Sequence, residues 1–260
     1  MVRRVRRLLG IKKVGHAGTL DPFATGLLIV CVGRAATRCI DQFMVGHKTY
    51  LARLQLGVET TTQDPEGEVT ATAEVPDLTS ETIASCLQRH TGAQMQAPPP
   101  FSAAKHLGKP LDAYARRGVL IEKAAKPITI LSLHCCSYDA LTHQLDIEVC
   151  CTRGTYVRVL AADIGRSLGC GAHLIALRRT ASGPLRVEQC VSGEELLGDN
   201  GRHCLLTVRM GIEEMLARHG QASDCACHGL QPSSIEEQTV PPYRPSDAGS
   251  GTHHPDSSKG

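Results

Sequence analysis

Apolar and polar residues follow regular spacings along the first 190 residues. In the segment 2–9 the apolar positions recur every three to four residues among four arginines, and Gly10 follows them. This spacing predicts a basic amphipathic helix that ends at the glycine. Residues 27–32 form an unbroken apolar run, which predicts a buried strand. The glycine-rich stretch over residues 15–26 predicts a loop in front of that strand.

Strand-type patterns dominate the middle of the chain. Residues 50–56 alternate apolar and polar side chains, and a polar turn leads from them to a second strand pattern at 68–73. The two segments predict a hairpin. Residues 128–138 and 145–151 are apolar runs rich in β-branched residues, separated by a short polar turn. They predict a second antiparallel pair.

Two further helices lie between these strands. Thr79 or Ser80 is a suitable cap for a helix that stops near Gly92, and residues 157–168 have helical spacing and are followed by a glycine. The apolar face of the first helix consists of Ile83, Ala84 and Leu87. A short strand is expected at 174–177. Antiparallel strands with helices between them predict an α+β fold around a mixed, mainly antiparallel sheet flanked by helices.

A chain of 260 residues is long enough for one sizeable domain with an appendage. We expect the main domain over residues 1–195, with an insertion at about 94–127. A short helical appendage is expected at 196–220. Residues 221–260 are dominated by Ser, Pro, Gly, His and Asp, a composition that predicts a disordered tail.

Charge divides the chain unevenly. Residues 1–190 carry 23 basic and 16 acidic residues, whereas residues 191–260 carry 5 and 10. A mildly basic body fits a polyanionic partner, although many proteins that never bind nucleic acid are as basic.

The twelve cysteines are scattered, and some adjacent pairs lie inside apolar runs, which favours reduced, buried thiols over disulfides. No run of about twenty apolar residues and no secretory signal is present, so we expect a soluble, cytoplasmic protein. Cys225, Cys227 and His228 resemble half of a metal site, but no second pair stands at zinc-ligand spacing. No metal is therefore expected.

The candidate chemical group is Asp21. It stands directly before Pro22, with glycines at positions 15, 18 and 26 around it. Glycines allow a substrate to approach the backbone closely, and the proline keeps Asp21 out of the helical region. The alternative is a structural loop in which Asp21 caps a turn.

Six segments carry a family resemblance, and they occur in a fixed order. They are Gly15 to Gly26, Lys48-Thr49-Tyr50, Thr60 to Gly67, Pro98 to Lys105 with Tyr114-Ala115-Arg116, Cys151 to Arg158, and Gly169 to Arg179. In this order they resemble the motifs of the TruB family of pseudouridine synthases. Members of that family usually begin with a strand and a Lys-Pro-Gly segment ahead of the first helix. This sequence begins within the helix, so we expect that strand to be missing.

The resemblance implies a pseudouridine synthase catalytic domain that isomerises a uridine in structured RNA, with the uridine at position 55 of the tRNA T loop as the expected target. The reaction breaks the N-glycosidic bond, rotates the uracil and joins C5 to the ribose, without redox change or external energy, so no cofactor is expected. By resemblance, Asp21 is the catalytic carboxylate. Whether it attacks the base or removes a ribose proton stays open.

Three side chains are expected around Asp21 by the same resemblance. Tyr50 matches the tyrosine that stacks on the flipped base, Tyr156 matches a second tyrosine of the pocket, and Arg158 matches the arginine that pairs with the aspartate and orients it. Without the motifs, a strand tyrosine is more often a core residue and a helix arginine more often a surface ion pair.

Four further residues are expected to contact the RNA. His16 matches a histidine that fills the space left by the flipped nucleotide, and Leu177 matches an apolar residue of the pocket. Lys105 and Arg116 belong to the basic insertion, which by resemblance grips the phosphates of the T-arm. The simpler alternatives are a loop histidine bonded to backbone, a core leucine and a solvated charged face.

The expected partner is therefore the tRNA T-arm stem-loop, bound by a monomer. Two alternatives remain. One is a catalytically impaired RNA-binding protein or tRNA-folding chaperone derived from the same family, and the other is the guide-RNA-dependent branch, whose members share the aspartate motif. Activity on bare tRNA separates the three.

Overall fold

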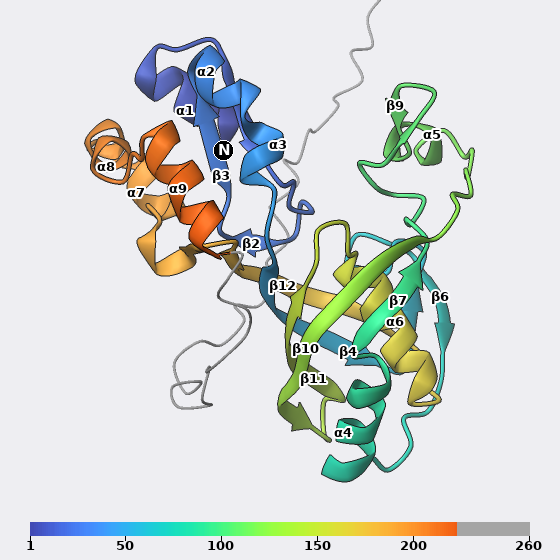
Figure 1. Cartoon of the computed structure of the whole chain (residues 1–260). Helices are drawn as coiled ribbons and strands as arrows, with labels where there is room; N and C mark the ends of the chain where they lie inside the picture. The colour runs from blue at the N-terminus through green and yellow to red at the C-terminus, as the bar shows by residue number, and fades with distance from the viewer. Residues whose placement is uncertain (223–260) are drawn as a thin grey trace, which may run out of the picture.

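The computed structural model describes residues 1–222, and its centre is a mainly antiparallel sheet (Figure 1). The expected tail at 221–260 lies almost entirely outside the described residues. The strands follow the order β13-β12-β4-β11-β10-β7, and β2 adds a short parallel pairing to β12. Their bounds are β2 Thr25–Gly26, β4 Lys48–Leu56, β7 Gly92–Gln96, β10 Lys126–Asp139, β11 Gln144–Cys151, β12 Ala172–Ser182 and β13 Leu185–Arg186. The predicted α+β class is confirmed.

Two helices cover one face of this sheet and enclose the main core. They are α4 (Ser80–Arg89) and α6 (Val157–Ser167), which contact β10 and β12 respectively and also contact each other. Alternate residues of β11 are buried, as expected for a strand with one face on the core. The fully buried side chains include Leu54, Ile130, Leu145, Ile147, Ile164 and Leu174.

The N-terminal segment forms a second, smaller body with the last helices of the described chain (Figure 1). Its parts are α1 Val2–Leu9, β1 Val14–Ala17, β3 Ile29–Val32, α2 Gly33–Arg38, α3 Ile40–Phe43, α7 Gly193–Leu197, α8 Gly201–Thr207 and α9 Ile212–Ala222. A small core of Ala17, Cys31, Phe43 and Met215 joins the N-terminal segment to α9. Residues 196–220 therefore pack on the N-terminal segment, while their status as a separate domain stays a prediction.

Three differences from the sequence patterns lie near the N-terminus. The stretch 15–26 is not only a loop, because β1 pairs with β3 and Thr25–Gly26 pairs with β12. The strand expected at 27–32 begins at Ile29 and is mostly half-buried, since β3 lies in a two-stranded sheet. A glycine-rich segment has too few side chains to show a strand pattern, so the pairings of β1 with β3 and of β2 with β12 were not predicted.

The first expected hairpin has a different partner. The segment at 68–73 contains β6 (Val69–Thr72), but it pairs with β5 (Val58–Thr60) and not with β4. Gly57 lies between β4 and β5 with φ +82°, a conformation that turns the chain out of the sheet. The second hairpin, β10 with β11, is confirmed.

The helix and strand limits also differ in detail. The Thr79 hydroxyl accepts from the Thr82 amide at 3.2 Å and caps α4, which ends at Arg89, before Gly92. Ala84 is exposed, and Cys86 takes its place in the core. The helices at 2–9 and 157–168 are found as expected, apart from the final residue of the second. The strand expected at 174–177 extends over eleven residues as β12.

The insertion projects from the sheet as a small separate unit (Figure 1). It contains β8 (Lys105–His106), β9 (Lys109–Pro110) and α5 (Asp112–Ala115), held by the buried Leu111. Among residues 1–222, no helix has the length and apolar character needed to cross a membrane.

Candidate active site

Asp21 lies in the loop between β1 and β2, with its carboxylate one-third exposed. The Arg158 guanidinium donates to both carboxylate oxygens, with Nε 2.8 Å from Oδ2 and Nη2 3.3 Å from Oδ1. The turn at this point uses the Asp21 main-chain carbonyl, which accepts from the Ala24 amide at 3.0 Å. The side chain is therefore not consumed as a turn cap and is presented, oriented, at the surface of the loop.

Arg158 joins the Asp21 loop to two other segments. It stands in the first turn of α6 and is only 3% exposed. Its Nη1 donates to the Thr62 carbonyl at 2.7 Å, and its Nη2 donates to the Phe101 carbonyl at 2.7 Å. All three guanidinium nitrogens are thus used, and a planar fork bound in this way cannot rotate without losing several bonds.

A second carboxylate completes the ion-pair group. Asp64 Oδ2 lies 3.3 Å from Arg158 Nη1, and the Asp64 side chain is 5% exposed. The Glu66 amide donates to Asp64 Oδ1 at 3.0 Å, and the Thr62 hydroxyl donates to the same oxygen. Arg158 is therefore a buried cation between one partly exposed and one buried carboxylate. The sequence patterns did not single out Asp64.

Tyr50 approaches the same group from β4. It is 8% exposed and belongs to the main core together with Phe23 and Leu177. Burial raises the pKa of Tyr50 to about 12, while Arg179 lowers it and Asp21 raises it. The hydroxyl is thus protonated at neutral pH and lies within electrostatic range of Asp21, so the side chain is a neutral aromatic surface.

The other expected site residues are placed less directly. Tyr156 is the residue directly before α6, two residues before Arg158. The Gln96 side chain accepts from the Tyr156 main-chain amide at 2.7 Å and donates to the Tyr156 carbonyl at 3.1 Å. His16 lies in β1, and its buried Nδ1 has no hydrogen-bond partner among the described residues. Leu177 is 5% exposed in β12. Their roles toward a substrate stay predictions.

Lys105 and Arg116 lie away from this group, on the projecting insertion. Lys105 is exposed in β8. Arg116 donates to Asp112, one turn earlier in the chain, at 3.0 Å. The Arg116 side chain is 67% and the Asp112 side chain 40% exposed, so this ion pair is weak and Arg116 can exchange it for a phosphate.

Arg179 is a functional candidate that the patterns did not isolate. It is 1% exposed in β12, and it donates from Nε to the Leu27 carbonyl at 2.8 Å and from Nη2 to the Gly18 carbonyl at 3.0 Å. One guanidinium thus ties together the two ends of the loop that carries Asp21. A Cβ on Gly26 would lie 2.3 Å from the Arg179 carbonyl oxygen, so only glycine fits where the loop meets β12.

Lys48 lies beside Arg179 and is also buried. It is 7% exposed, and its Nζ donates to the carbonyls of Met44 at 3.2 Å and Gly46 at 3.4 Å. Burial, followed by the nearby Arg179, lowers the pKa of Lys48 to about 8. A lysine in a strand of alternating pattern gives no sign of this burial.

Lys48 should make stability rise with pH above 8. The pKa of Lys48 is about 8 in the folded protein, whereas an ordinary lysine has a pKa of 10.5, so between these pH values the unfolded chain binds more protons. The free energy of unfolding of the wild type, relative to Lys48→Met, should rise by up to about 3 kcal/mol from pH 8 to 10.5. Urea titrations of both proteins across this range measure the difference. A difference that does not change with pH would contradict the assignment.

Comparison with known proteins decides the family. The model of the N-terminal domain of TruB family pseudouridylate synthases matches residues 6–157, and the model of the tRNA pseudouridylate synthase B C-terminal domain matches residues 158–206. The chain belongs to the TruB family of pseudouridylate synthases. The boundary between the two matches falls directly before Arg158, so the TruB ion pair joins a residue of one matched region to a residue of the other.

Individual relatives agree with the family match. The chain is 50% identical over 218 residues to tRNA pseudouridine synthase B of Desulfotalea psychrophila, covering 83% of this chain and 89% of that protein. It is 44% identical over 197 residues to the protein of the same name from Francisella philomiragia, covering 75% of this chain and 64% of that protein. It therefore spans most of one TruB relative and less than two thirds of the other.

Solved structures support the fold. The chain shares 25% identity and a TM-score of 0.58 with a chain of a Cbf5–Nop10–Gar1 complex, over 84% of this chain and 54% of that one. An H/ACA RNP bound to a substrate RNA containing 2′-deoxyuridine contains a chain with a TM-score of 0.56 at 21% identity, over 84% of this chain and 56% of that one. The chain spans about half the length of these two chains.

The described residues of this TruB family member hold no group of three or more His, Cys, Asp or Glu side chains that could bind a metal. The Cys225, Cys227 and His228 cluster lies outside the described residues. None of the described cysteines is in a disulfide. Four of them are buried, namely Cys31, Cys86, Cys151 and Cys170, whereas Cys135 and Cys190 are exposed.

Proposed function

We propose that the protein isomerises one T-loop uridine of tRNA, at position 55, to pseudouridine, and that Asp21 is the catalytic carboxylate. One observation carries the proposal: a one-third exposed carboxylate is held at two points by a guanidinium that is 3% exposed. A carboxylate oriented in this way can act as a nucleophile or as a base beside a bound nucleoside. The relatives that cover most of the chain are named tRNA pseudouridine synthase B.

The proposed reaction balances without a cofactor. The N1–C1′ bond breaks, the uracil rotates, a C5–C1′ bond forms, and the C5 proton leaves to solvent while N1 gains one. Reactant and product are isomers, so no oxidant, reductant or energy source is consumed. Asp21 assists the cleavage and re-formation at the sugar or base, while Arg158 keeps both oxygens of Asp21 in place.

The target base must leave its stack before Asp21 can reach it. We assign the neutral ring of Tyr50 to stacking against the base, with Tyr156 and Leu177 as further walls. His16 would occupy the space left in the RNA, and its unpartnered Nδ1 is available for a contact with that RNA. Lys105 and Arg116 would hold backbone phosphates through the insertion.

We further propose that the protein acts alone, as a monomer in the cytoplasm. A single chain supplies Asp21, Arg158 and Tyr50, which supports a monomer. The relatives named tRNA pseudouridine synthase B are 41–50% identical to this chain, against 25% for the chain from the Cbf5–Nop10–Gar1 complex. This difference favours action on bare tRNA over dependence on a guide RNA.

The test uses an unmodified tRNA transcript carrying tritium at C5 of uridine. Because the C5 hydrogen is lost when C5 bonds to the sugar, each turnover releases one tritium. We expect release equivalent to one uridine per tRNA, without guide RNA or added metal. A folded protein that binds tRNA but releases no tritium would be an RNA-binding protein or chaperone instead, and release only with guide RNA would favour the guide-dependent branch.

A further inference from the structure

Helix α1 and the segment after it form the most one-sidedly charged part of the chain. Residues 1–20 contain six basic side chains and no acidic one, and the first carboxylate in the sequence is Asp21. The basic residues are Arg3, Arg4, Arg6, Arg7, Lys12 and Lys13. Like charges so close together repel each other, and the repulsion is relieved when an anion binds between them.

Two of these side chains have a structural use. Arg4 donates to the carbonyls of Leu196 and Leu197, at 2.8 and 3.0 Å, and so fixes α1 to the end of α7. Arg6 donates to the Val14 carbonyl at 2.9 Å. Both contacts are made to backbone carbonyls and leave the positive charge without a carboxylate.

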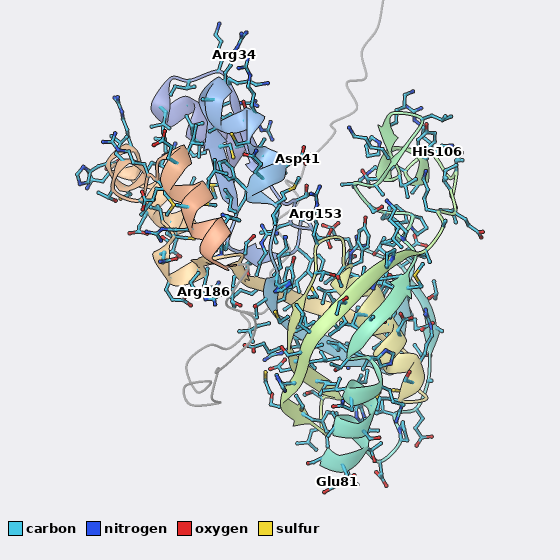
Figure 2. All side chains as sticks on the ribbon, viewed as in Figure 1. Arg34, Asp41, Glu81, His106, Arg153 and Arg186 are labelled. Atoms are coloured by element: carbon cyan, nitrogen blue, oxygen red, sulfur yellow. The ribbon has the colours of Figure 1, made fainter. Side chains whose placement is uncertain are left out.

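For Arg3, Arg7 and Lys12 no comparable hydrogen bond to a main-chain carbonyl is found among the described residues. All three are exposed, and none forms an ion pair with a carboxylate of residues 1–222. Arg53, Arg116, Arg153, Arg166 and Arg218 do pair with acidic side chains, whereas other exposed arginines, among them Arg117 and Arg202, form no ion pair with a described residue. What distinguishes α1 and the segment after it is the number of unpaired cations close together in the chain. Arg34, on α2, points outward from the same body (Figure 2) and is likewise without an ion pair to a described residue.

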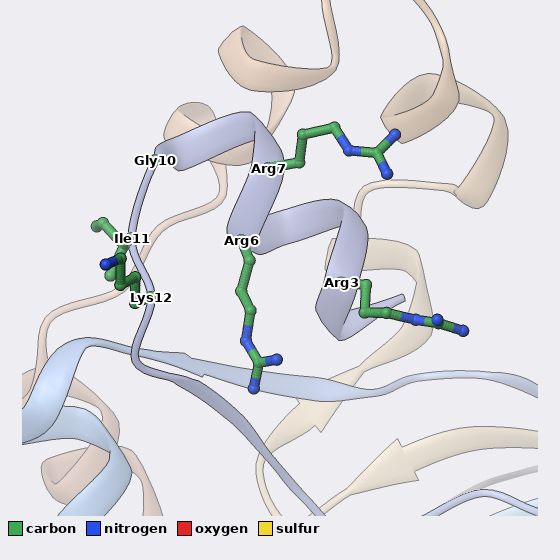
Figure 3. Close-up of a pocket in the computed structure, with 6 residues that line it drawn as sticks. All are labelled: Arg3, Arg6, Arg7, Gly10, Ile11 and Lys12. Carbon is green, nitrogen blue, oxygen red and sulfur yellow. The ribbon is translucent and has the colours of Figure 1, made fainter.

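A shallow hollow of about 520 Å³ lies at α1 and the segment after it, lined by Arg3, Arg6, Arg7, Gly10, Ile11 and Lys12. Figure 3 shows Arg3, Arg6 and Arg7 projecting from α1, and Ile11 and Lys12 on the segment that follows Gly10. Four of the six lining residues are cationic and only Ile11 is large and apolar. A neutral ligand would not compensate the four positive charges. The open shape of the hollow suits an extended anion that is recognised by its charge.

A membrane surface fits this helix less well than RNA does. A basic amphipathic helix binds a bilayer by inserting its apolar face. In α1 that face is already packed against the protein: Val5 is 1% exposed, and Val2, Leu8 and Leu9 are partly buried. Only the charges remain for a partner, and the phosphate backbone of RNA is the polyanion that the proposed function brings to this protein.

We propose that Arg3, Arg7 and Lys12 form a second phosphate-binding surface, the α1 patch, that contacts tRNA outside the T-loop. This inference rests on the proposed function. In Figure 1 the body that contains α1 and the insertion stand on opposite sides, with β2, which follows the Asp21 loop, between them. An RNA whose target loop reaches Asp21 can therefore meet basic side chains on both sides, and the α1 patch makes the protein prefer whole tRNA over an isolated T-arm.

The test compares two variants that each lose two positive charges. Arg3→Gln/Arg7→Gln removes charge from the α1 patch, and the matched control Arg89→Gln/Arg166→Gln removes it at the ends of α4 and α6. For the α1 patch variant, we expect KM for full-length tRNA to rise roughly tenfold with kcat unchanged, and the slope of log Kd against log salt to fall by about 2. KM for an isolated T-arm stem-loop should stay the same. The control variant should leave all these values unchanged.

Several results would overturn the inference. They are an unchanged salt slope in the α1 patch variant, an equal rise in KM for stem-loop and tRNA, or an equal effect of the control variant. Tighter tRNA binding by the α1 patch variant would also overturn it, because the loss of phosphate contacts cannot strengthen binding. The salt slope is measured by binding alone, so it decides the inference even if the wild type forms no pseudouridine.

Discussion

Asp21→Asn should eliminate pseudouridine formation while leaving tRNA binding almost unchanged. The amide keeps the size of the side chain and one oxygen acceptor for Arg158, but it is neither a nucleophile nor a base at neutral pH. We expect the rate of conversion to fall by at least roughly 10³-fold. The nucleosides of digested tRNA, separated by chromatography, measure the product, and filter binding measures the affinity.

The control for this variant is Asp41→Asn. Asp41 is an exposed carboxylate on α3 that pairs with Arg153 at 3.5 Å, and Figure 2 shows the two residues where the N-terminal body comes close to the sheet. Because both side chains are more than half exposed, its loss should change neither stability nor rate appreciably. Substantial turnover in Asp21→Asn would refute the assignment of Asp21.

Arg158→Met should cause the largest loss of stability of any single change in the site. It leaves the Asp64 carboxylate, 5% exposed, without its cation, and it removes the hydrogen bonds to Thr62 and Phe101. Removal of one partner of a buried ion pair costs about 3–5 kcal/mol. Urea denaturation should show a loss of this size, and the folded fraction should turn over at least about 100-fold more slowly because Asp21 loses its orientation.

Arg53→Met is a matched control for that measurement. Arg53 and Asp146 also form a two-point contact, at 2.7 and 2.7 Å, but on the partly exposed face of the sheet. The expected loss is about 1 kcal/mol, with no change in rate. Equal losses in the two variants would mean that burial of Asp64 does not determine the cost.

Helices and strands were predictable where the signals that form them lie within the segment itself. The helices at 2–9 and 157–168 and the pair formed by β10 and β11 have regular apolar spacing and clear end signals. The pairings of β1 and β2 were not predictable, because backbone hydrogen bonds made by a glycine-rich segment leave no pattern of side chains. The pairing of β6 with β5, and not with β4, was not predictable either, because it depends on how the chain turns at Gly57 in the folded protein.

Some residues of the candidate site were also predictable from the sequence, and others were not. Motif resemblance pointed to Asp21 and Arg158, and the structure places them in contact. It gave no role to Asp64, Arg179 or Lys48, which are all buried. A buried cation that binds main-chain carbonyls looks, in sequence, the same as a cation in solvent. Only the folded chain shows that Arg179 closes the Asp21 loop.

Position-resolved mapping of pseudouridine in tRNA tests the central claim most directly. Wild-type protein and unmodified transcript, incubated without guide RNA, should give pseudouridine at a single T-loop position, 55, and the parallel reaction with Asp21→Asn should give none. Absence of pseudouridine with folded wild-type protein, or product formed equally by Asp21→Asn, would contradict the account.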